Sequence, residues 1–310
     1  MTAGDERLVL CQHRWMAVDD WLLVGAPWDS SGTGRAEQDA PDALRAAGLT
    51  DLIGLDLGDA ATPIRTSERD HETGVRALAD TVRAAHALAD VLTPPLQDQA
   101  GRRLLVVGGD CSLLLGVFPA LRRTLGRVGL ALVDGHPDYL DGAASDTGET
   151  ADMELAVLTG RGHAVLAELA GPPPMVAVDD AVLLGHRTTA LDEASAAEVA
   201  RLPDALTRID AAAVIEDATR AGELAAALLG DRCERYWVHI DLDVLDEQAL
   251  PAVTYPQPDG PGCNQLAALI RPLLAHPGLV GLSLADFRPD LDPEGAYARR
   301  MVELLRQTMS

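Results

Sequence analysis

Short apolar runs alternate along the chain with longer segments in which apolar residues recur at helical spacing. This alternation is typical of repeated βα units, which place parallel strands in one sheet and helices against its faces. The apolar runs predict strands at residues 21–26, 104–107, 130–133, 176–184, 236–242 and 280–285. The helical spacing predicts helices near residues 41–47, 70–92, 112–123, 153–159, 191–201, 211–229, 264–275 and 293–306. The pattern therefore predicts an α/β fold with a parallel sheet.

A few punctuating residues set the expected boundaries. Pro94 and Pro95 are expected to end the helix that begins near residue 70, and Ser112 is expected to cap the next helix. No internal repeat or domain linker is visible in the sequence. We therefore expect a single domain over residues 1–310, of which residues 1–19 form an N-terminal extension.

Two groups of ligand-capable side chains coincide with apolar runs. Asp134, His136 and Asp138 occupy alternate positions directly after one run, and Asp241 and Asp243 repeat the alternation within another. Because strand side chains alternate between faces, each group could project to one side. Burying such groups is costly unless a positive charge lies between them. The pattern therefore indicates a divalent metal site, and its oxygen and imidazole donors suit manganese, magnesium or zinc.

A third segment, residues 108–111 (GGDC), also follows a predicted strand. In open parallel sheets, sites form beyond the carboxyl ends of the strands. All three segments fall at such ends, so we expect them to share one site. The alternative is that the acids cap helices or form surface turns, and the occurrence of two acids within an apolar run argues against it.

The amino-acid composition and net charge exclude several classes of function. The chain has 310 residues, of which 47% are hydrophobic, and this is enough for a sizeable core. It contains no lysine, which excludes Schiff-base chemistry and a phosphate-binding P-loop. The net charge of −23 opposes binding to nucleic acid or to an anionic membrane surface.

The sequence also carries few signs of export. No apolar stretch reaches the roughly 20 residues needed to span a bilayer, and no basic region followed by an apolar core opens the chain. The four cysteines have neither disulfide-framework nor metal-ribbon spacing. We expect a cytoplasmic protein that binds neither nucleic acid nor membrane.

Four segments taken together carry a family resemblance. They are residues 23–28 (LVGAPW) with 40–45 (APDALR), 107–112 (VGGDCS), 134–138 (DGHPD) and 239–246 (HIDLDVLD). In this order, and along most of the chain, they resemble the ureohydrolases, the arginase and agmatinase family. The resemblance implies a three-layer α/β/α, arginase-deacetylase-like fold with a parallel sheet of about eight strands. It also implies a binuclear manganese centre.

The resemblance further implies ligands for each ion. The first ion would be held by Cys111, Asp134, Asp138 and Asp241. The second would be held by Asp134, His136, Asp241 and Asp243. In such a centre a hydroxide attacks a guanidinium carbon, Asp138 hydrogen-bonds that nucleophile, and Asp246 orients the ligands.

The chain departs from the family in its first motif, which usually ends in histidine and here ends in Cys111. A thiolate is a softer ligand that favours zinc over manganese. The thiol could equally stay protonated and pack as a small hydrophobe. We therefore expect two Mn²⁺ ions, with Zn²⁺ or a single ion as alternatives. Cysteine at this position resembles family members that hydrolyse an N-hydroxylated arginine.

The loop after the second motif also departs from the family. Arginases place there a histidine for proton transfer, and Ala151 stands at its position. Glu149 and Asp152 are candidates for acid–base function or for binding a cation, and Thr147 for contacting the substrate; helix capping is the alternative. Asp286 falls near the acidic residue that binds the guanidinium in arginases.

Three hypotheses follow. The first is an amidinohydrolase that cleaves a linear C–N bond of a guanidino compound, such as an arginine derivative or an agmatine-like molecule, and releases urea or a substituted urea. The second is a mononuclear amide hydrolase or deacetylase of the same fold. The third is an inactive family member with a binding role. The resemblance implies a homo-oligomer, either a trimer or a hexamer.

Overall fold

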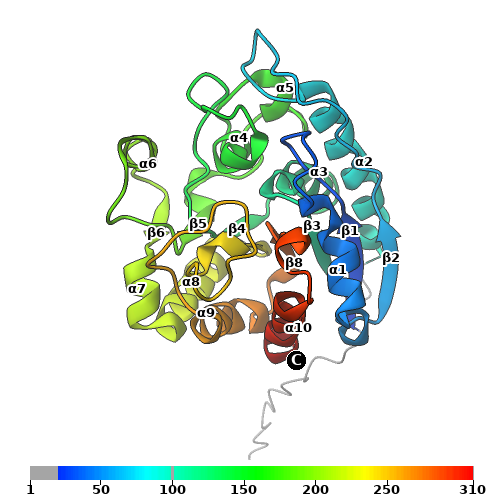
Figure 1. Ribbon diagram of the computed structural model, residues 1–310, viewed down its shortest axis with the longest axis vertical. Helices are drawn as coiled ribbons and strands as arrows, with labels where there is room; N and C mark the ends of the chain where they lie inside the picture. Colours follow the sequence, from blue (N-terminus) through cyan, green and yellow to red (C-terminus); the bar gives the residue numbers. More distant parts are fainter. Residues whose placement is uncertain (1–19, 99–100, 310) are drawn as a thin grey trace, which may run out of the picture.

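A single sheet of eight parallel strands forms the centre of the molecule (Figure 1). The structure is a computed structural model that describes residues 20–98 and 101–309. The strands are β1 (Trp21–Ala26), β2 (Leu55–Asp59), β3 (Arg103–Gly108), β4 (Gly129–Val133), β5 (Ala181–Leu184), β6 (Thr207–Ile209), β7 (Tyr236–Asp241) and β8 (Leu279–Ala285). Their order across the sheet is β2-β1-β3-β8-β7-β4-β5-β6, and every neighbouring pair is parallel.

Helices cover both faces of this sheet. They are α1 (Ala40–Ala46), α2 (Leu78–Gln97), α3 (Leu114–Leu125), α4 (Glu154–Leu158), α5 (Ala164–Ala167), α6 (Glu193–Val199), α7 (Ala211–Glu216), α8 (Ala218–Arg232), α9 (Cys263–Ala275) and α10 (Ala296–Met309). Alternate residues of β3 enter different cores: Leu105 and Val107 pack with α1 and α8–α10, while Leu104 and Val106 pack with α2–α5. The predicted three-layer α/β/α fold with about eight parallel strands is confirmed.

The order of the four central strands brings distant segments together. β3, β8, β7 and β4 are consecutive neighbours although they come from three separate parts of the chain. Val107 pairs with Leu284, Leu284 with Ile240, and Ile240 with Val133, so the four strands end at nearly the same level. The segments that follow these strands therefore meet at one edge of the sheet.

The apolar runs located the buried strands but missed the two edge strands. β2 is mostly exposed and β6 is only partly buried, so neither needs the apolar run that marks a central strand. The strand predicted over residues 176–184 is shorter in the structure, because Val178–Asp180 forms a 3₁₀ turn before β5 begins.

Several helix boundaries differ from the predicted ones because of local capping. The single helix predicted over residues 211–229 is two helices, because the Asp217 side chain accepts a hydrogen bond from Arg220 N (3.0 Å) and starts α8. The cap predicted at Ser112 is provided instead by Asp110, whose carboxylate accepts a hydrogen bond from Ser112 N (2.9 Å). The last helix begins and ends about one turn later than predicted, at Ala296–Met309.

The helix predicted over residues 70–92 is displaced towards the C-terminus. Asp70 Oδ1 accepts hydrogen bonds from the amide and hydroxyl of Thr73 (both 2.8 Å), and this turn delays α2 until Leu78. Pro94 and Pro95 do not end the helix, which runs to Gln97. Proline has a helical φ, and the buried Leu92 and Leu96 hold the last turns against the core.

The N-terminal extension predicted at residues 1–19 lies outside the described residues. Within the part of the chain that the structure describes, no helix combines the length and apolar character needed to cross a bilayer.

Candidate metal centre

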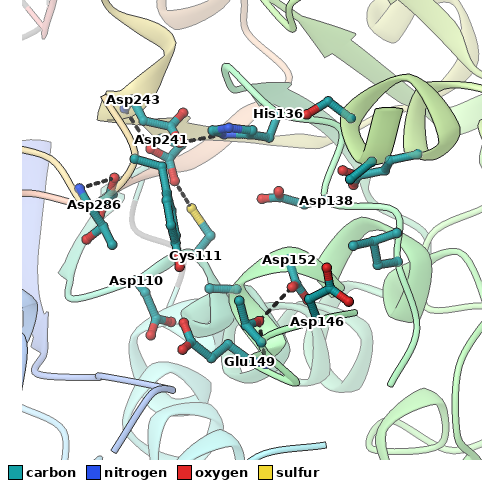
Figure 2. Close-up of a pocket in the computed structure, with 18 of the residues that line it drawn as sticks. Asp110, Cys111, His136, Asp138, Asp146, Glu149, Asp152, Asp241, Asp243 and Asp286 are labelled. Atoms are coloured by element: carbon teal, nitrogen blue, oxygen red, sulfur yellow. Dashed lines mark hydrogen bonds and ion pairs between the residues drawn. The ribbon is translucent and has the colours of Figure 1, made fainter. Parts of the chain in front are cut away.

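The four central strand ends supply one cluster of side chains, as the sequence predicted. Cys111 follows β3, Asp134 follows β4, Asp241 closes β7 and Asp286 follows β8. Figure 2 shows Cys111, Asp241, His136 and Asp138 pointing towards a common space. The sheet topology therefore assembles donors from segments more than 100 residues apart in the sequence.

Cys111 begins the 3₁₀ helix Cys111–Leu113 and is 1% exposed. Its Sγ contacts the Asp241 carboxylate on one side and lies 3.1 Å from His239 Nε2 on the other. Two residues earlier, Gly109 lets the loop pass against the backbone of Trp28, because a Cβ at position 109 would lie 1.5 Å from Trp28 O. Burial, and then the charge of Asp241, raises the pKa of the Cys111 thiol well above its usual value.

The segment at 134–138 leaves the strand and turns over the carboxyl end of the sheet. Asp134 Oδ1 accepts a hydrogen bond from His136 N (2.7 Å), and His136 Nδ1 lies 2.7 Å from Asp243 Oδ2. Asp138 adopts a positive φ of 47°, which turns the chain sharply at that point. The three residues thus converge through a turn, whereas the sequence interpretation relied on strand alternation.

Asp241 and Asp243 are held by the same kind of turn. Asp241 is the last residue of β7, and its Oδ1 accepts a hydrogen bond from Asp243 N (2.7 Å). Asp243 lies in the 3₁₀ helix Leu242–Val244, beyond the predicted strand. Arg187 supports this turn by donating to the carbonyl oxygens of Val244 (2.7 Å) and Leu245 (3.1 Å).

The site holds more negative charge than its own residues can balance. Burial, followed by neighbouring carboxylates, raises the pKa of Asp134, Asp138 and Asp241 well above the usual range. Burial also opposes ionisation of Asp243, but the adjacent His136 lowers the pKa of Asp243 overall. Such a set of buried acids favours a bound cation.

Two overlapping groups of donor atoms fit that cation. In each group all donor atoms lie within 4.8 Å of one another. The first group consists of Cys111, Asp134, Asp138 and Glu154; the second consists of Asp134, His136 and Asp243. Asp134 belongs to both, and its buried Oδ2 accepts no hydrogen bond from any described residue. The donor set and this unpartnered oxygen fit a pair of divalent ions that share Asp134.

The remaining predicted ligand, Asp241, contacts Cys111 and groups with Asp243 and Asp286. The structure therefore brings all six predicted ligands into one place, and their roles as ligands stay predictions. Asp246, predicted to orient the ligands, accepts a hydrogen bond from Gln248 N (2.9 Å) in the loop beyond them. Arg187 supports the same segment through the Val244 and Leu245 carbonyls, and the role of Asp246 stays a prediction.

A cavity of about 490 Å³ opens beside the cluster. Figure 2 shows Glu149 and Asp152 on the opposite side of this space from Asp241. Glu149 is paired with Arg35, whose guanidinium nitrogens lie 2.8 and 2.6 Å from its two carboxylate oxygens. Asp152 accepts hydrogen bonds from Ser145 Oγ (2.6 Å) and Thr147 Oγ1 (2.8 Å). All of these predicted substrate-loop residues reach the cavity or its wall.

A second acidic group lines the cavity near Asp286. Burial, and then the charge of Asp243, raises the pKa of Asp286 to about 7. Glu37 lies nearby and is 2% exposed; burial, followed by the charge of Asp110, raises its pKa to about 9. Thr254 N donates to both carboxylate oxygens of Asp286 at 3.2 and 3.1 Å. This end of the cavity is suited to a cationic group.

Sequence reasoning missed several residues of the site. Arg35, Glu37 and Glu154 were not predicted, and His239 entered only as the first residue of the 239–246 segment. Glu154 stands first in the short apolar helix α4, where an acid is the ordinary choice for a helix N-terminus. Arg35 lies in a Gly/Ser-rich loop, and nothing in that loop's local pattern points to Glu149. Only the three-dimensional arrangement identifies these side chains.

Fold and site together define an α/β/α protein with a cluster of donor groups that could hold metal ions at the carboxyl ends of its central strands. A family model described as the arginase family matches residues 19–310. The chain belongs to that family, the ureohydrolases.

Individual relatives agree with this assignment. The chain is 28% identical to an arginase of Bacillus caldovelox over 294 residues, which cover 91% of this chain and 95% of that protein. It is 30% identical to a formimidoylglutamase of Aeromonas hydrophila over 238 residues, which cover 72% of this chain and 67% of that protein. The solved structure of the B. caldovelox arginase has a TM-score of 0.83 and 27% identity, and covers 94% of this chain and 98% of that chain.

Proposed function

We propose that this protein is a metal-dependent amidinohydrolase that cleaves a linear C–N bond of a guanidino compound and releases urea or a substituted urea. The observation that carries the proposal is the convergence of thiol, imidazole and carboxylate donors beside a cavity that ends at the buried Asp286. The similarity to an arginase and to a formimidoylglutamase supports the same reaction class.

The cofactor that we propose is a pair of Mn²⁺ ions, with Zn²⁺ as the alternative that Cys111 favours. Cys111 and Asp138 would face one ion, His136 and Asp243 the other, and Asp134 and Asp241 both. When bound, two such ions supply a hydroxide nucleophile near neutral pH and polarise the substrate.

The side chains of this chain have separate tasks in the reaction. A C–O bond forms from water, the bond between the guanidinium carbon and the substituted nitrogen breaks, and that nitrogen gains a proton. Asp138 reaches the cavity from the 134–138 turn and is placed to hold the proton of the water at a carboxylate oxygen. Asp286 would bind the cationic guanidinium head, because its carboxylate lies among the buried acids at the end of the cavity.

The substrate loop supports a modified arginine over arginine itself. Ala151 lines the cavity where arginases carry their proton-transfer histidine, so Glu149 would have to take that role. Glu149 is held by Arg35, and the pair offers both a carboxylate and a guanidinium to the polar end of a substrate. Thr147 and Asp152 complete this side of the cavity. N-hydroxyarginine is the substrate that we would test first.

The direct test is a screen of the manganese-loaded protein for urea release from arginine, N-hydroxyarginine, agmatine and guanidino acids. At least one compound should be turned over, and Asp138→Asn should lower kcat by about 100-fold or more because the positioned acid–base group is removed. Asp90→Asn removes a surface acid paired with Arg123 and serves as the control. Failure to hydrolyse any guanidino compound while two ions are bound would rule the proposal out.

Metal content separates the alternatives. Two ions per chain support the amidinohydrolase, one ion supports a mononuclear amide hydrolase of the same fold, and none supports an inactive member with a binding role. We also propose, from the family resemblance, that one ureohydrolase-like domain forms a homo-oligomer, a trimer or a hexamer. Light scattering of the purified protein tests that point, and a monomer would contradict it.

A further inference from the structure

Glu154 is a buried acid of the candidate metal centre that has no task in the proposed reaction. It is the first residue of α4 and is 0% exposed. The other four residues of this helix, Leu155–Leu158 in sequence, are apolar and equally buried. Among the described residues no N–H or hydroxyl group donates to either carboxylate oxygen, Oε1 or Oε2, and the polar neighbour that Glu154 can share a proton with is the Asp138 carboxyl. A carboxylate in that position is costly unless something positive faces it.

The carboxylate of Glu154 is directed into the candidate metal centre. One of its oxygens lies within 4.8 Å of donor atoms of Cys111, Asp134 and Asp138. None of these three neighbours carries a positive charge, so they add to the burial cost instead of relieving it. Asp134 Oδ2, in the same group, is also buried and unpartnered. Three carboxylate oxygens that receive no N–H or hydroxyl hydrogen bond from any described residue thus border the same small space.

We propose that Glu154 is a ligand of the ion beside Cys111, a role that rests on the metal centre proposed above. The ion would then have one sulfur and four carboxylates around it, those of Asp134, Asp138, Asp241 and Glu154. Carboxylate oxygen is the donor that Mn²⁺ prefers, whereas thiolate favours softer ions. Glu154 therefore compensates for Cys111 and keeps this position suited to a hard divalent cation.

The first test compares metal binding by Glu154→Gln and the wild-type protein. Glutamine keeps the shape of the side chain but removes its charge. Calorimetric titration of metal-free protein with Mn²⁺ should show two ions in the wild type. In the variant, one ion should bind at least about tenfold more weakly, since even groups that only support ligands are worth 10- to 100-fold in affinity. Equal affinity for both ions in the two proteins would overturn the proposal.

Glu198→Gln is the matched control. Glu198 is also a buried glutamate of this cavity, at 8% exposure, but it accepts a hydrogen bond from Tyr139 N (2.8 Å) and belongs to neither donor group. Glutamine preserves that hydrogen bond, so this variant should bind both ions within about threefold of the wild type. A loss as large as that of Glu154→Gln would overturn the proposal, because any buried acid would then have the same effect.

A second measurement does not depend on how the variant folds. In crystals of the manganese-loaded wild-type protein, a Glu154 oxygen should lie at bonding distance from an ion, within about 2.0–2.6 Å. An ion beside Asp134 and Asp138 with both Glu154 oxygens beyond about 3.5 Å would refute the role of Glu154 and leave the proposed reaction standing. A wild-type protein that binds no divalent ion would refute the metal centre itself.

Discussion

At the scale of single residues, the surroundings of Cys111 decide which form of the thiol a metal would meet. Trp237 Nε1 donates to Ser283 Oγ (2.8 Å), which in turn lies 2.7 Å from His239 Nδ1. Because an indole can only donate, the serine proton is free to point at His239 Nδ1. His239 Nε2 then carries the imidazole proton and faces Cys111 Sγ at 3.1 Å. The N–H of His239 therefore points at the sulfur and can stabilise Cys111 as a thiolate.

The same surroundings keep the pair neutral until a cation binds. Burial lowers the pKa of His239 to about 3, so the imidazole is uncharged at neutral pH. Burial also raises the pKa of the Cys111 thiol, and the contact with Asp241 raises it further. A divalent ion that displaces the thiol proton would remove this penalty.

Replacing the thiol tests this ligand. Cys111→Ser should abolish the thiolate-to-metal charge-transfer absorption of the cobalt-loaded protein and weaken binding of one ion by about tenfold or more. Cys233→Ser is the control, because Cys233 is also buried, at 4% exposure, but it caps the C-terminus of α8 and does not line the cavity. Absorption spectra and metal titrations give both readouts. An unchanged charge-transfer band in Cys111→Ser would show that the sulfur does not ligate.

Some residues of the site could be identified from the sequence alone, and others could not. Asp134, His136 and Asp241 could be found because polar groups beside apolar runs are conspicuous. Glu154 and Arg35 could not, because an acid at a helix start and an arginine in a loop are ordinary surface choices. Their significance comes from neighbours that the fold brings to them: Glu154 lies beside Cys111, Asp134 and Asp138, and Arg35 pairs with Glu149, 114 residues away in the chain.

At the scale of elements, one arginine organises the loop that carries the substrate-side residues. The Arg69 guanidinium donates to the carbonyl oxygens of Gly74 (2.6 Å), Gly142 (2.9 Å), Ser145 (2.6 Å) and Asp146 (3.1 Å). Gly74 has a φ of 73°, and a Cβ there would lie 2.0 Å from Gly142 O, so the two loops touch through their backbones. The position of the loop therefore depends on a segment outside the site.

Arg69→Ala should loosen this loop while leaving the sheet intact. We expect a loss of about 1–2 kcal/mol in the free energy of unfolding, since charged donors to four carbonyls are removed. Hydrogen exchange should accelerate over residues 140–150, and KM should rise more than kcat falls. Arg83→Ala, which removes an exposed arginine paired with Asp80, should change neither exchange nor KM. Unchanged exchange in Arg69→Ala would contradict the role of Arg69.

Elements were predictable from the sequence to the extent that burial marks them. Each central strand is buried on both faces and appears as an apolar run, whereas β2 and β6 lie at the sheet edges and do not. Helix boundaries depended on single side chains. Asp217 separates α7 from α8, and the Asp70–Thr73 turn delays the start of α2. Neither feature interrupts the apolar spacing from which the helices were predicted. Strand order, which assembles the site, has no local signature.

At the scale of the whole molecule, acidity is a property of the interior as well as the surface. The net charge is −23, and the cavity collects buried acids on both of its sides. Most of these acids have raised pKa values, so the metal-free protein holds protons that the unfolded chain releases. Metal-free protein should therefore lose stability as the pH rises.

Glu37 provides a measurable case, because its pKa rises from 4.5 to about 9. Between these two pKa values the folded state keeps a proton that the unfolded state has lost. The stability that this proton contributes is therefore fully present below about pH 4.5 and is lost as the pH rises to about 9. The free energy of unfolding should fall by up to about 1.4 kcal/mol per pH unit from this group. Glu37→Gln should remove that slope. Urea unfolding in EDTA at pH 5.5 and 8 measures it, and parallel pH dependence in the two proteins would contradict the prediction.

The central proposal is that the protein hydrolyses a guanidino compound only with two metal ions bound. One titration tests both the ion count and the reaction. The rate of urea release from the best guanidino substrate is measured while Mn²⁺ is added stepwise to metal-free protein of known concentration. The predicted rate rises with added metal and levels off at two bound ions per chain, while Asp138→Asn stays about 100-fold or more slower throughout. A rate that levels off at one ion, or no urea release with both ions bound, would contradict the account.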